Sequence, residues 1–194
     1  MIIAVDGPSA AGKGTLARGV AKHFGYHFLD TGSLYRMVGL SVLRGAADPV
    51  VVARNLDPAE FKDSDLRDEK VAQAASKVAG VPEVRQALLE FQRSFARKKP
   101  GAVLDGRDIG TVICPKADFK FYVTASVQAR AERRFKELRA TGITLENITD
   151  DIKSRDERDA KQSQPAEDAI LIDTSELTAE ECLHEVIKVI EEGN

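Results

Sequence analysis

The chain opens with Met1-Ile2-Ile3-Ala4-Val5-Asp6 and continues directly into Gly7-Pro8-Ser9-Ala10-Ala11-Gly12-Lys13-Gly14-Thr15. An apolar strand thus leads into a glycine-containing loop that ends in a lysine. Gly7 and Gly12 allow the backbone to curl around an anion with its N–H groups turned inward, and Lys13 adds a positive charge. The pattern predicts a phosphate-binding loop at the N-terminus of a helix, whose dipole also favours an anion.

The residues after the loop support this prediction. Leu16, Val20 and Phe24 are apolar at helical spacing, so the strand, loop and helix that the motif requires all have a sequence signal. The position after Lys13 is Gly14, where many such loops place a Ser or Thr that binds magnesium, and the hydroxyl comes one residue later at Thr15. This Gly-Lys-Gly-Thr form resembles the loops of nucleoside monophosphate kinases. No direct metal ligand is therefore assigned in the chain, and residues 7–15 are expected to bind the phosphates of ATP from a solvent-facing loop.

Composition limits the class of protein. The chain has 194 residues, of which 43% are hydrophobic and 30% charged, which fits one globular domain with an insertion. A net charge of −3 argues against a nucleic-acid polymer as partner. Cys114 and Cys182 show no metal-ligand spacing with each other or with the histidines. We expect a monomeric cytoplasmic enzyme with reduced thiols and no membrane segment.

The rest of the chain alternates short apolar stretches with helical patterns. Strands are expected at residues 2–6, 28–30, 101–105, 119–124 and 169–173. This alternation predicts an α/β fold with a five-stranded parallel sheet between helices, a three-layer sandwich. Ligands of such sheets bind at the carboxyl ends of the strands. Residues 45–68 are the least regular part, with at most one further short strand at residues 50–53.

Three further segments point to a reaction. They are Leu29-Asp30-Thr31-Gly32-Ser33-Leu34-Tyr35-Arg36, then Asp105-Gly106-Arg107-Asp108-Ile109-Gly110-Thr111, and later Arg155-Asp156-Glu157-Arg158-Asp159. With these segments the chain resembles bacterial cytidylate (CMP) kinases of the P-loop nucleoside monophosphate kinase family. The resemblance extends over nearly the whole chain. It rests on the order and joint occurrence of the pieces, since each one alone is common.

The resemblance implies roles for individual residues. Phosphoryl transfer between nucleotides brings two polyanions together, so catalysis is mostly charge neutralisation and in-line positioning, for which the planar fork of arginine is suited. Lys13, Arg107, Arg155 and Arg158 are the implied catalytic residues. The implied acceptor-site residues are Thr31, Arg36, Ser76, Arg85, Asp105, Arg107, Asp108, Arg155 and Asp159.

Within that set the implied tasks differ. Arg36 and Arg107 would grip the acceptor phosphate, and Arg155 and Arg158 would close over the transferring group. Asp105 would steady water bound to magnesium beside the loop. Ser76, Arg85 and Asp108 would read the base. The acceptor is already a phosphate oxyanion near neutral pH, so no general base is assigned. On residue type alone, the arginines could equally decorate a solvated helix face, and Asp105 could be a turn cap.

The resemblance divides residues 1–194 into a single kinase domain that carries an acceptor-binding insert at residues 45–100 and a helical lid at residues 139–165. The insert is shorter than in many relatives. After Asp159 the family often continues with another Arg and an Ala-Pro-Leu segment, whereas this chain reads Ala160-Lys161-Gln162-Ser163-Gln164-Pro165. One lid cation is therefore missing or replaced by Lys161.

The expected function is transfer of the terminal phosphoryl group of ATP, with Mg²⁺ bound to the nucleotide, to CMP and dCMP. Three alternatives stay open from the sequence. One is a kinase for UMP or another small acceptor. Another is a GTPase-like switch, although no Asn-Lys-x-Asp motif is present. The last is a nucleotide-binding module without catalysis.

Overall fold

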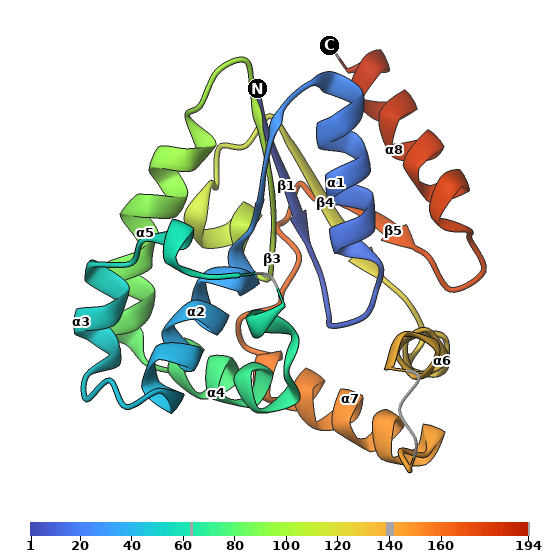
Figure 1. Ribbon diagram of the computed structural model, residues 1–194. Coiled ribbons are helices and arrows are strands. Elements are labelled where there is room, and N and C mark those ends of the chain that lie inside the picture. Colours follow the sequence, from blue (N-terminus) through green and yellow to red (C-terminus); the bar gives the residue numbers. More distant parts are fainter. Residues whose placement is uncertain (63, 139–141, 194) are drawn as a thin grey trace. The chain divides into compact units, whose positions relative to one another are not determined.

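The computed structural model describes residues 1–62, 64–138 and 142–193 (Figure 1). The chain forms two compact units. Unit 1 comprises Met1–Leu29 and Lys98–Asn194, and unit 2 comprises Asp30–Arg97. Each unit is described by itself below. The expected lid begins at residue 139, and residues 139–141 lie outside the described part of the chain.

Unit 1 is built on a five-stranded sheet with the order β2-β3-β1-β4-β5. The strands are β1 (Ile2–Asp6), β2 (His27–Asp30), β3 (Ala102–Gly106), β4 (Phe119–Thr124) and β5 (Ile170–Asp173). β1 pairs in parallel with both β3 and β4, and β4 pairs in parallel with β5. The predicted α/β fold with a five-stranded parallel sheet is confirmed, since the five strands expected at residues 2–6, 28–30, 101–105, 119–124 and 169–173 all form.

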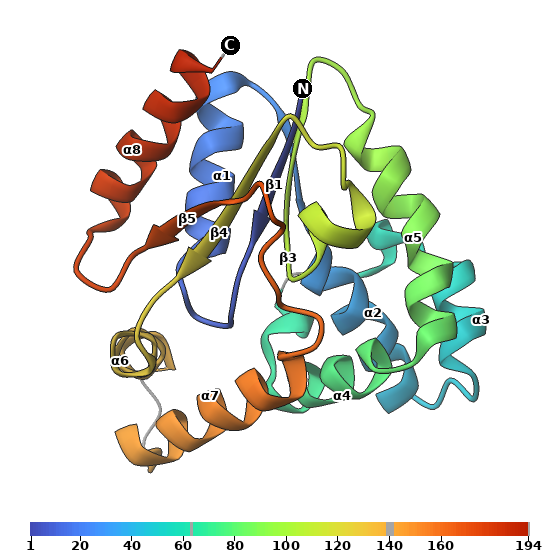
Figure 2. The same cartoon turned by 180° about the vertical axis from the view of Figure 1, so that it is seen from behind.

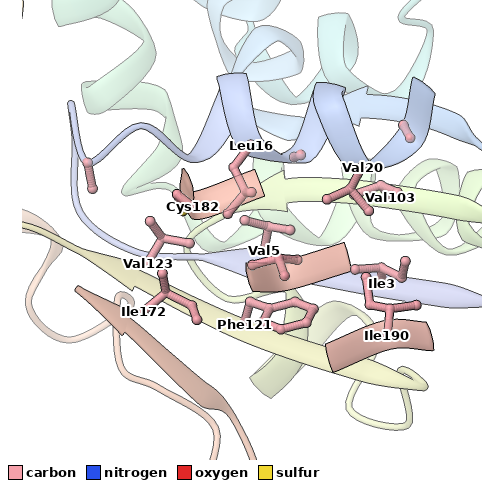
Figure 3. Close-up of a cluster of buried hydrophobic side chains, with 14 residues drawn as sticks. Ile3, Val5, Leu16, Val20, Val103, Phe121, Val123, Ile172, Cys182 and Ile190 are labelled. Carbon is pink, nitrogen blue, oxygen red and sulfur yellow. The ribbon is translucent and has the colours of Figure 1, made fainter. Parts of the chain in front are cut away.

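Helices α1 (Lys13–Phe24) and α8 (Ala179–Glu192) lie together on one face of the sheet (Figures 1 and 2). Figure 3 shows Leu16 and Val20 of α1 directed toward the strand residues Val5 and Val103. The same cluster takes in residues of β4, β5 and α8: Phe121, Val123, Ile172, Cys182, Val186 and Ile190. This apolar core holds the carboxyl ends of β1 and β4 and the start of α1 in fixed positions.

Two further helices of unit 1, α6 (Val127–Leu138) and α7 (Leu145–Asp159), pack against each other through a separate small cluster. Its buried members are Ala131, Ile148 and Ile152. Thr144 caps α7 in a capping box with Asn147, and Thr178 caps α8 in the same way with Glu181. None of the described helices is long and apolar enough to cross a membrane.

Unit 2 is helical. It contains α2 (Thr31–Leu43), α3 (Pro49–Arg54), α4 (Glu69–Ala79) and α5 (Pro82–Ala96), with short 3₁₀ turns at Pro58–Glu60 and Asp65–Arg67. The strand expected at residues 50–53 is wrong, because these residues belong to α3. Asp48 caps this helix by accepting a hydrogen bond from the Val50 N–H at 2.8 Å, and Pro49 occupies its first turn. The cap and the proline together favour a helix more strongly than the β-branched residues of the segment favour a strand.

Close packing of α2 and α4 depends on Gly39. A Cβ atom at this position would lie 2.7 Å from the Ala75 nitrogen and 3.0 Å from the Ala74 carbonyl carbon, both backbone atoms. At Gly19 of α1 the three atoms nearest to a Cβ would all belong to the Leu183 side chain, with its two methyl carbons at 3.0 Å. The two glycines therefore differ in what must move to admit a methyl group.

We predict that Gly39→Ala destabilises the protein, because backbone overlap costs about 1–3 kcal/mol and exceeds the gain of about 1 kcal/mol expected from replacing a helical glycine. Gly19→Ala is the matched control and should be neutral or stabilising, since Leu183 can rotate away. Urea unfolding of both variants measures the difference. Equal unfolding free energies for the two variants would contradict the packing role of Gly39.

Candidate functional site

The segment between β1 and α1 has the backbone conformation of a phosphate loop. Gly7, Ala10 and Gly12 have φ of 142°, 59° and 89°. At Gly7 a Cβ would lie 1.9 Å from the Val123 carbonyl oxygen, so no other residue fits there. Gly12 ends the loop and directly precedes α1, whose first residue is Lys13. The first N–H groups of α1 therefore face the loop.

The carbonyl groups of the loop accept hydrogen bonds from side chains around it. The Gly7 carbonyl accepts from Arg107 at 2.8 Å, the Pro8 carbonyl from Lys13 at 3.0 Å and the Ser9 carbonyl from Arg130 at 3.2 Å. The Ala11 carbonyl accepts from the Thr174 hydroxyl at 3.0 Å. In a trans peptide the N–H points away from the C=O, so these contacts turn several loop N–H groups to the opposite side.

Lys13 and Asp105 form the charged centre of the site. Their Nζ and Oδ1 atoms are 3.9 Å apart, and a Cβ on Gly14 would lie 3.2 Å from Asp105 Oδ2. The Lys13 side chain is only 8% exposed. The expectation of a solvent-facing loop is therefore wrong for this residue: its stem is buried, and its ammonium is held by a carboxylate and a carbonyl. Thr15, by contrast, is exposed in the first turn of α1.

The Arg107-Asp108 motif follows β3 and is fixed by Asp6. One Asp6 oxygen accepts from the Ile109 N–H at 2.8 Å and the other from the Gly110 N–H at 2.7 Å. Ile109–Ile113 form a single π-helical turn, and Asp108, directly before it, is buried. Burial raises the pKa of Asp6 to about 6, although the two backbone hydrogen bonds act against this rise.

Helix α7 brings several charged residues to the same region of unit 1. Asp159 accepts from Arg107 Nε at 3.0 Å. Asp156 pairs with both terminal nitrogens of Arg130, at 2.9 and 2.6 Å. Arg155 pairs with Asp151 on its own helix at 2.9 Å, and Arg158 is exposed. Among the site residues predicted in unit 1, the structure thus joins Lys13 with Asp105 and Arg107 with Asp159.

The remaining predicted site residues belong to unit 2. Thr31 is the buried first residue of α2, and Arg36 is half-buried one turn further along that helix. Ser76 lies on α4. Arg85 lies on α5 with its guanidinium carbon 5.9 Å from the centre of the Tyr35 ring, a cation–π distance. Asp30 precedes them as the cap of α2, accepting from the Ser33 N–H at 3.2 Å.

Sequence reasoning missed Asp6, Arg130 and Asp156 as parts of this site. In the sequence, Asp6 is the last residue of an expected strand, and Asp156 belongs to a charged motif in which it has no implied role. Arg130 is not among the implied site residues. The Thr174 hydroxyl also contacts the loop, since it donates to the Ala11 carbonyl. The position of Asp6 before Gly7 is a usable signal, since it ends a buried strand at the loop.

The site is a phosphate loop at the carboxyl edge of a parallel sheet, with one lysine and two arginines on its carbonyl groups. These features define a P-loop protein. Solved structures support this fold. An uncharacterized protein from Eubacterium ventriosum has a TM-score of 0.62 at 14% identity, with 98% of each chain covered. Shikimate kinase from Acinetobacter baumannii has a TM-score of 0.53 at 18% identity, covering 99% of this chain and 93% of that chain.

Sequence comparison is more specific. The family model for cytidylate kinase matches residues 3–62 and 58–192. A cytidylate kinase of Cereibacter sphaeroides is 54% identical, over 97% of this chain and 94% of that protein. One from Paramagnetospirillum magneticum is 50% identical, over 97% of each. The chain belongs to the cytidylate kinase family.

Asp6 gives this site a pH dependence. Its pKa of about 6 in the fold lies above the ordinary value of 3.8, so the folded protein binds the Asp6 proton more tightly than the unfolded chain does. The free energy of unfolding should therefore fall by up to about 3 kcal/mol as pH rises from 4 to 6, and the loss persists above pH 6. Asp6→Asn should lack this dependence. Urea unfolding of wild type and variant across this range measures the difference.

Asp173→Asn is the control for this experiment. Hydrogen bonds from Ser175 lower the pKa of the exposed Asp173 carboxyl below 3.8, so this group stays ionised between pH 5 and 6, the upper part of the tested range. The difference in unfolding free energy between wild type and Asp173→Asn should stay constant in that range. Parallel stability curves for wild type and Asp6→Asn would rule out the raised pKa.

Proposed function

We propose that this protein transfers the terminal phosphoryl group of ATP to CMP, and also to dCMP, giving ADP and the corresponding diphosphate. Membership in the cytidylate kinase family supports the reaction and the acceptor. The observation in unit 1 that carries the proposal is the loop itself, whose carbonyls accept hydrogen bonds from Arg107, Lys13 and Arg130. Such a loop presents its N–H groups to a polyphosphate.

At the donor side, Lys13 is the residue we assign to the outer phosphates of ATP. Its ammonium is held by Asp105 and by the Pro8 carbonyl, so it is in place before the nucleotide binds. A charge that is already positioned stabilises the transition state without reorganisation at the moment of reaction. Arg155 and Arg158 on α7 are proposed to add positive charge over the transferring group.

At the acceptor side, we assign Arg107 and Arg36 to the phosphate of CMP. Arg107 is partly buried, and its Asp159 partner is 29% exposed, so an incoming phosphate can compete for the guanidinium. Thr31, Ser76, Arg85 and Asp159 are proposed to complete the acceptor site. The acceptor oxygen is an oxyanion near neutral pH, so the residues need only to align it and shield its charge.

Mg²⁺ fits this site as a companion of the nucleotide. The Asp105 carboxylate, on a side chain that is 12% exposed and lies beside the loop near Gly14, is the type of oxygen donor that Mg²⁺ prefers. We propose that Asp105 holds water bound to the ion, which supplies charge neutralisation between the phosphates. Monomeric state and cytoplasmic location stay predictions from the sequence.

Asp108 is proposed to recognise cytosine. Cytosine offers an amino donor and a ring acceptor where uracil offers a carbonyl and an N–H, so a carboxylate at the amino group discriminates between them. Asp108 is 6% exposed, and a carboxylate with so little access to water penalises a wrong partner strongly.

The proposed reaction is tested by a coupled assay of ADP release with ATP and Mg²⁺ across CMP, dCMP, UMP and AMP. We expect the highest kcat/KM with CMP, comparable turnover with dCMP, and a kcat/KM for UMP lower by about a hundredfold. A higher kcat/KM with UMP or AMP would show that this nucleotide, and not CMP, is the preferred acceptor. ATP hydrolysis that is indifferent to every acceptor would refute the proposed transfer.

Asp108→Asn should lower kcat/KM for CMP sharply and shrink the ratio of CMP to UMP efficiencies, because the amide can rotate to donate to the uracil carbonyl. If Asp108 only orients its neighbour Arg107, both substrates lose equally and the ratio stays at the wild-type value. The ratio measured in wild type and variant therefore separates base recognition from positioning.

A further inference from the structure

Arg130 has an environment unlike that of a surface arginine. It lies on α6 within a basic stretch, yet its side chain is only 4% exposed. Its Nε donates to the Ala125 carbonyl at 3.0 Å, and its Nη1 donates both to the Ser9 carbonyl at 3.2 Å and to Asp156 Oδ1 at 2.9 Å. Its Nη2 donates to Asp156 Oδ2 at 2.6 Å. A buried guanidinium with this many fitted acceptors is held in one position.

The contact with Ser9 has a consequence for the loop. Because a trans peptide places C=O and N–H on opposite sides, holding the Ser9 carbonyl at Arg130 directs the Ala10 N–H away from Arg130. Ala10 has φ of 59°, a conformation that non-glycine residues adopt only when neighbouring groups enforce it. Loop N–H groups turned in this way are the ones that bind phosphate.

Asp156 extends this contact to α7. Asp156 and Asp159 are three residues apart and so lie on the same side of the helix. Each pairs with an arginine that also holds a loop carbonyl. Asp156 pairs with Arg130, which donates to the Ser9 carbonyl. Asp159 pairs with Arg107, which donates to the Gly7 carbonyl. The helix thus contacts the loop through charged side chains at two places, separately from its apolar packing on α6.

We propose that Arg130 is a positioning residue of the ATP site and that Asp156 holds it in place, so that the phosphate loop keeps the conformation that binds ATP. The inference rests on the proposed function in taking the anion of the loop to be ATP. The position of Arg130 should affect the binding of ATP, because the carbonyl that Arg130 holds belongs to the phosphate loop. The hydrogen-bond partners of Arg130 include none of the residues assigned to CMP.

A purely structural role would look different. Helix α7 already packs on α6 through Ala131, Ile148 and Ile152. If the Arg130–Asp156 ion pair only reinforced this packing, its loss would lower the Tm without altering the affinity of the folded enzyme for ATP. Affinity for ATP is therefore the readout that separates the two roles.

The test uses Asp156→Asn in the full chain. Asp156 is 31% exposed on a helix surface and Asn has nearly its shape, so the variant is expected to fold. We expect the KM for ATP, and its Kd in titration calorimetry without CMP, to rise by about tenfold to a hundredfold. The KM for CMP should stay within about twofold of the wild-type value. Arg130→Lys should act in the same direction, and Asp156→Glu, which keeps the charge, should recover most of the affinity.

Asp150→Asn is the matched control, with the same change on the same helix at a side chain that is 71% exposed. It should leave the ATP affinity unchanged. The proposal is overturned if folded Asp156→Asn and Arg130→Lys bind ATP within about twofold of wild type, or if the KM for CMP rises as much as that for ATP. Failure of the wild type to phosphorylate CMP would refute the proposed function instead, and the Kd for ATP would still decide the role of Arg130.

Discussion

The candidate site depends on the close approach of two backbones at Gly7. The chain leaves β1 with φ of 142° and passes over the Val123 carbonyl of the neighbouring strand β4, where any Cβ would overlap it at 1.9 Å. This contact sets the loop against the carboxyl edge of the sheet. From there its carbonyls lie within reach of Arg107 after β3, Thr174 after β5 and Arg130 on α6. One steric requirement thus places the groups that orient the loop.

The charges around the loop are arranged in pairs. Lys13 faces Asp105, Arg107 faces Asp159, and Arg130 faces Asp156. Each cation is partly or largely buried, and a buried cation without a counter-ion would be strongly destabilising. The aspartates therefore allow the protein to hold positive charge at the loop before any nucleotide is present. A polyphosphate then meets cations that are already in position, which favours binding without rearrangement of the loop.

Much of the fold could be predicted from the sequence because its signals are local. The alternation of apolar strands with helical patterns indicates a parallel sheet, and the capping boxes at Thr144 and Thr178 mark where two helices begin. The prediction failed at residues 50–53, where three consecutive valines favour a strand but Asp48 and Pro49 start a helix. The strand propensity of the valines is a weaker signal there than the helix cap and the proline, since these two act on the backbone directly.

The sequence by itself determined the phosphate loop, the order of the strands along the chain and the family to which the motifs belong, because these are contiguous patterns with strict chemical requirements. Only the tertiary structure decided which charges serve the loop. Arg130 and Asp156 are separated by 26 positions, and neither is distinguishable in the sequence from its charged neighbours. The same holds for Asp6, whose partners Ile109 and Gly110 come more than 100 positions later. Burial and pairing depend on which segments the sheet brings side by side, and that information is not local.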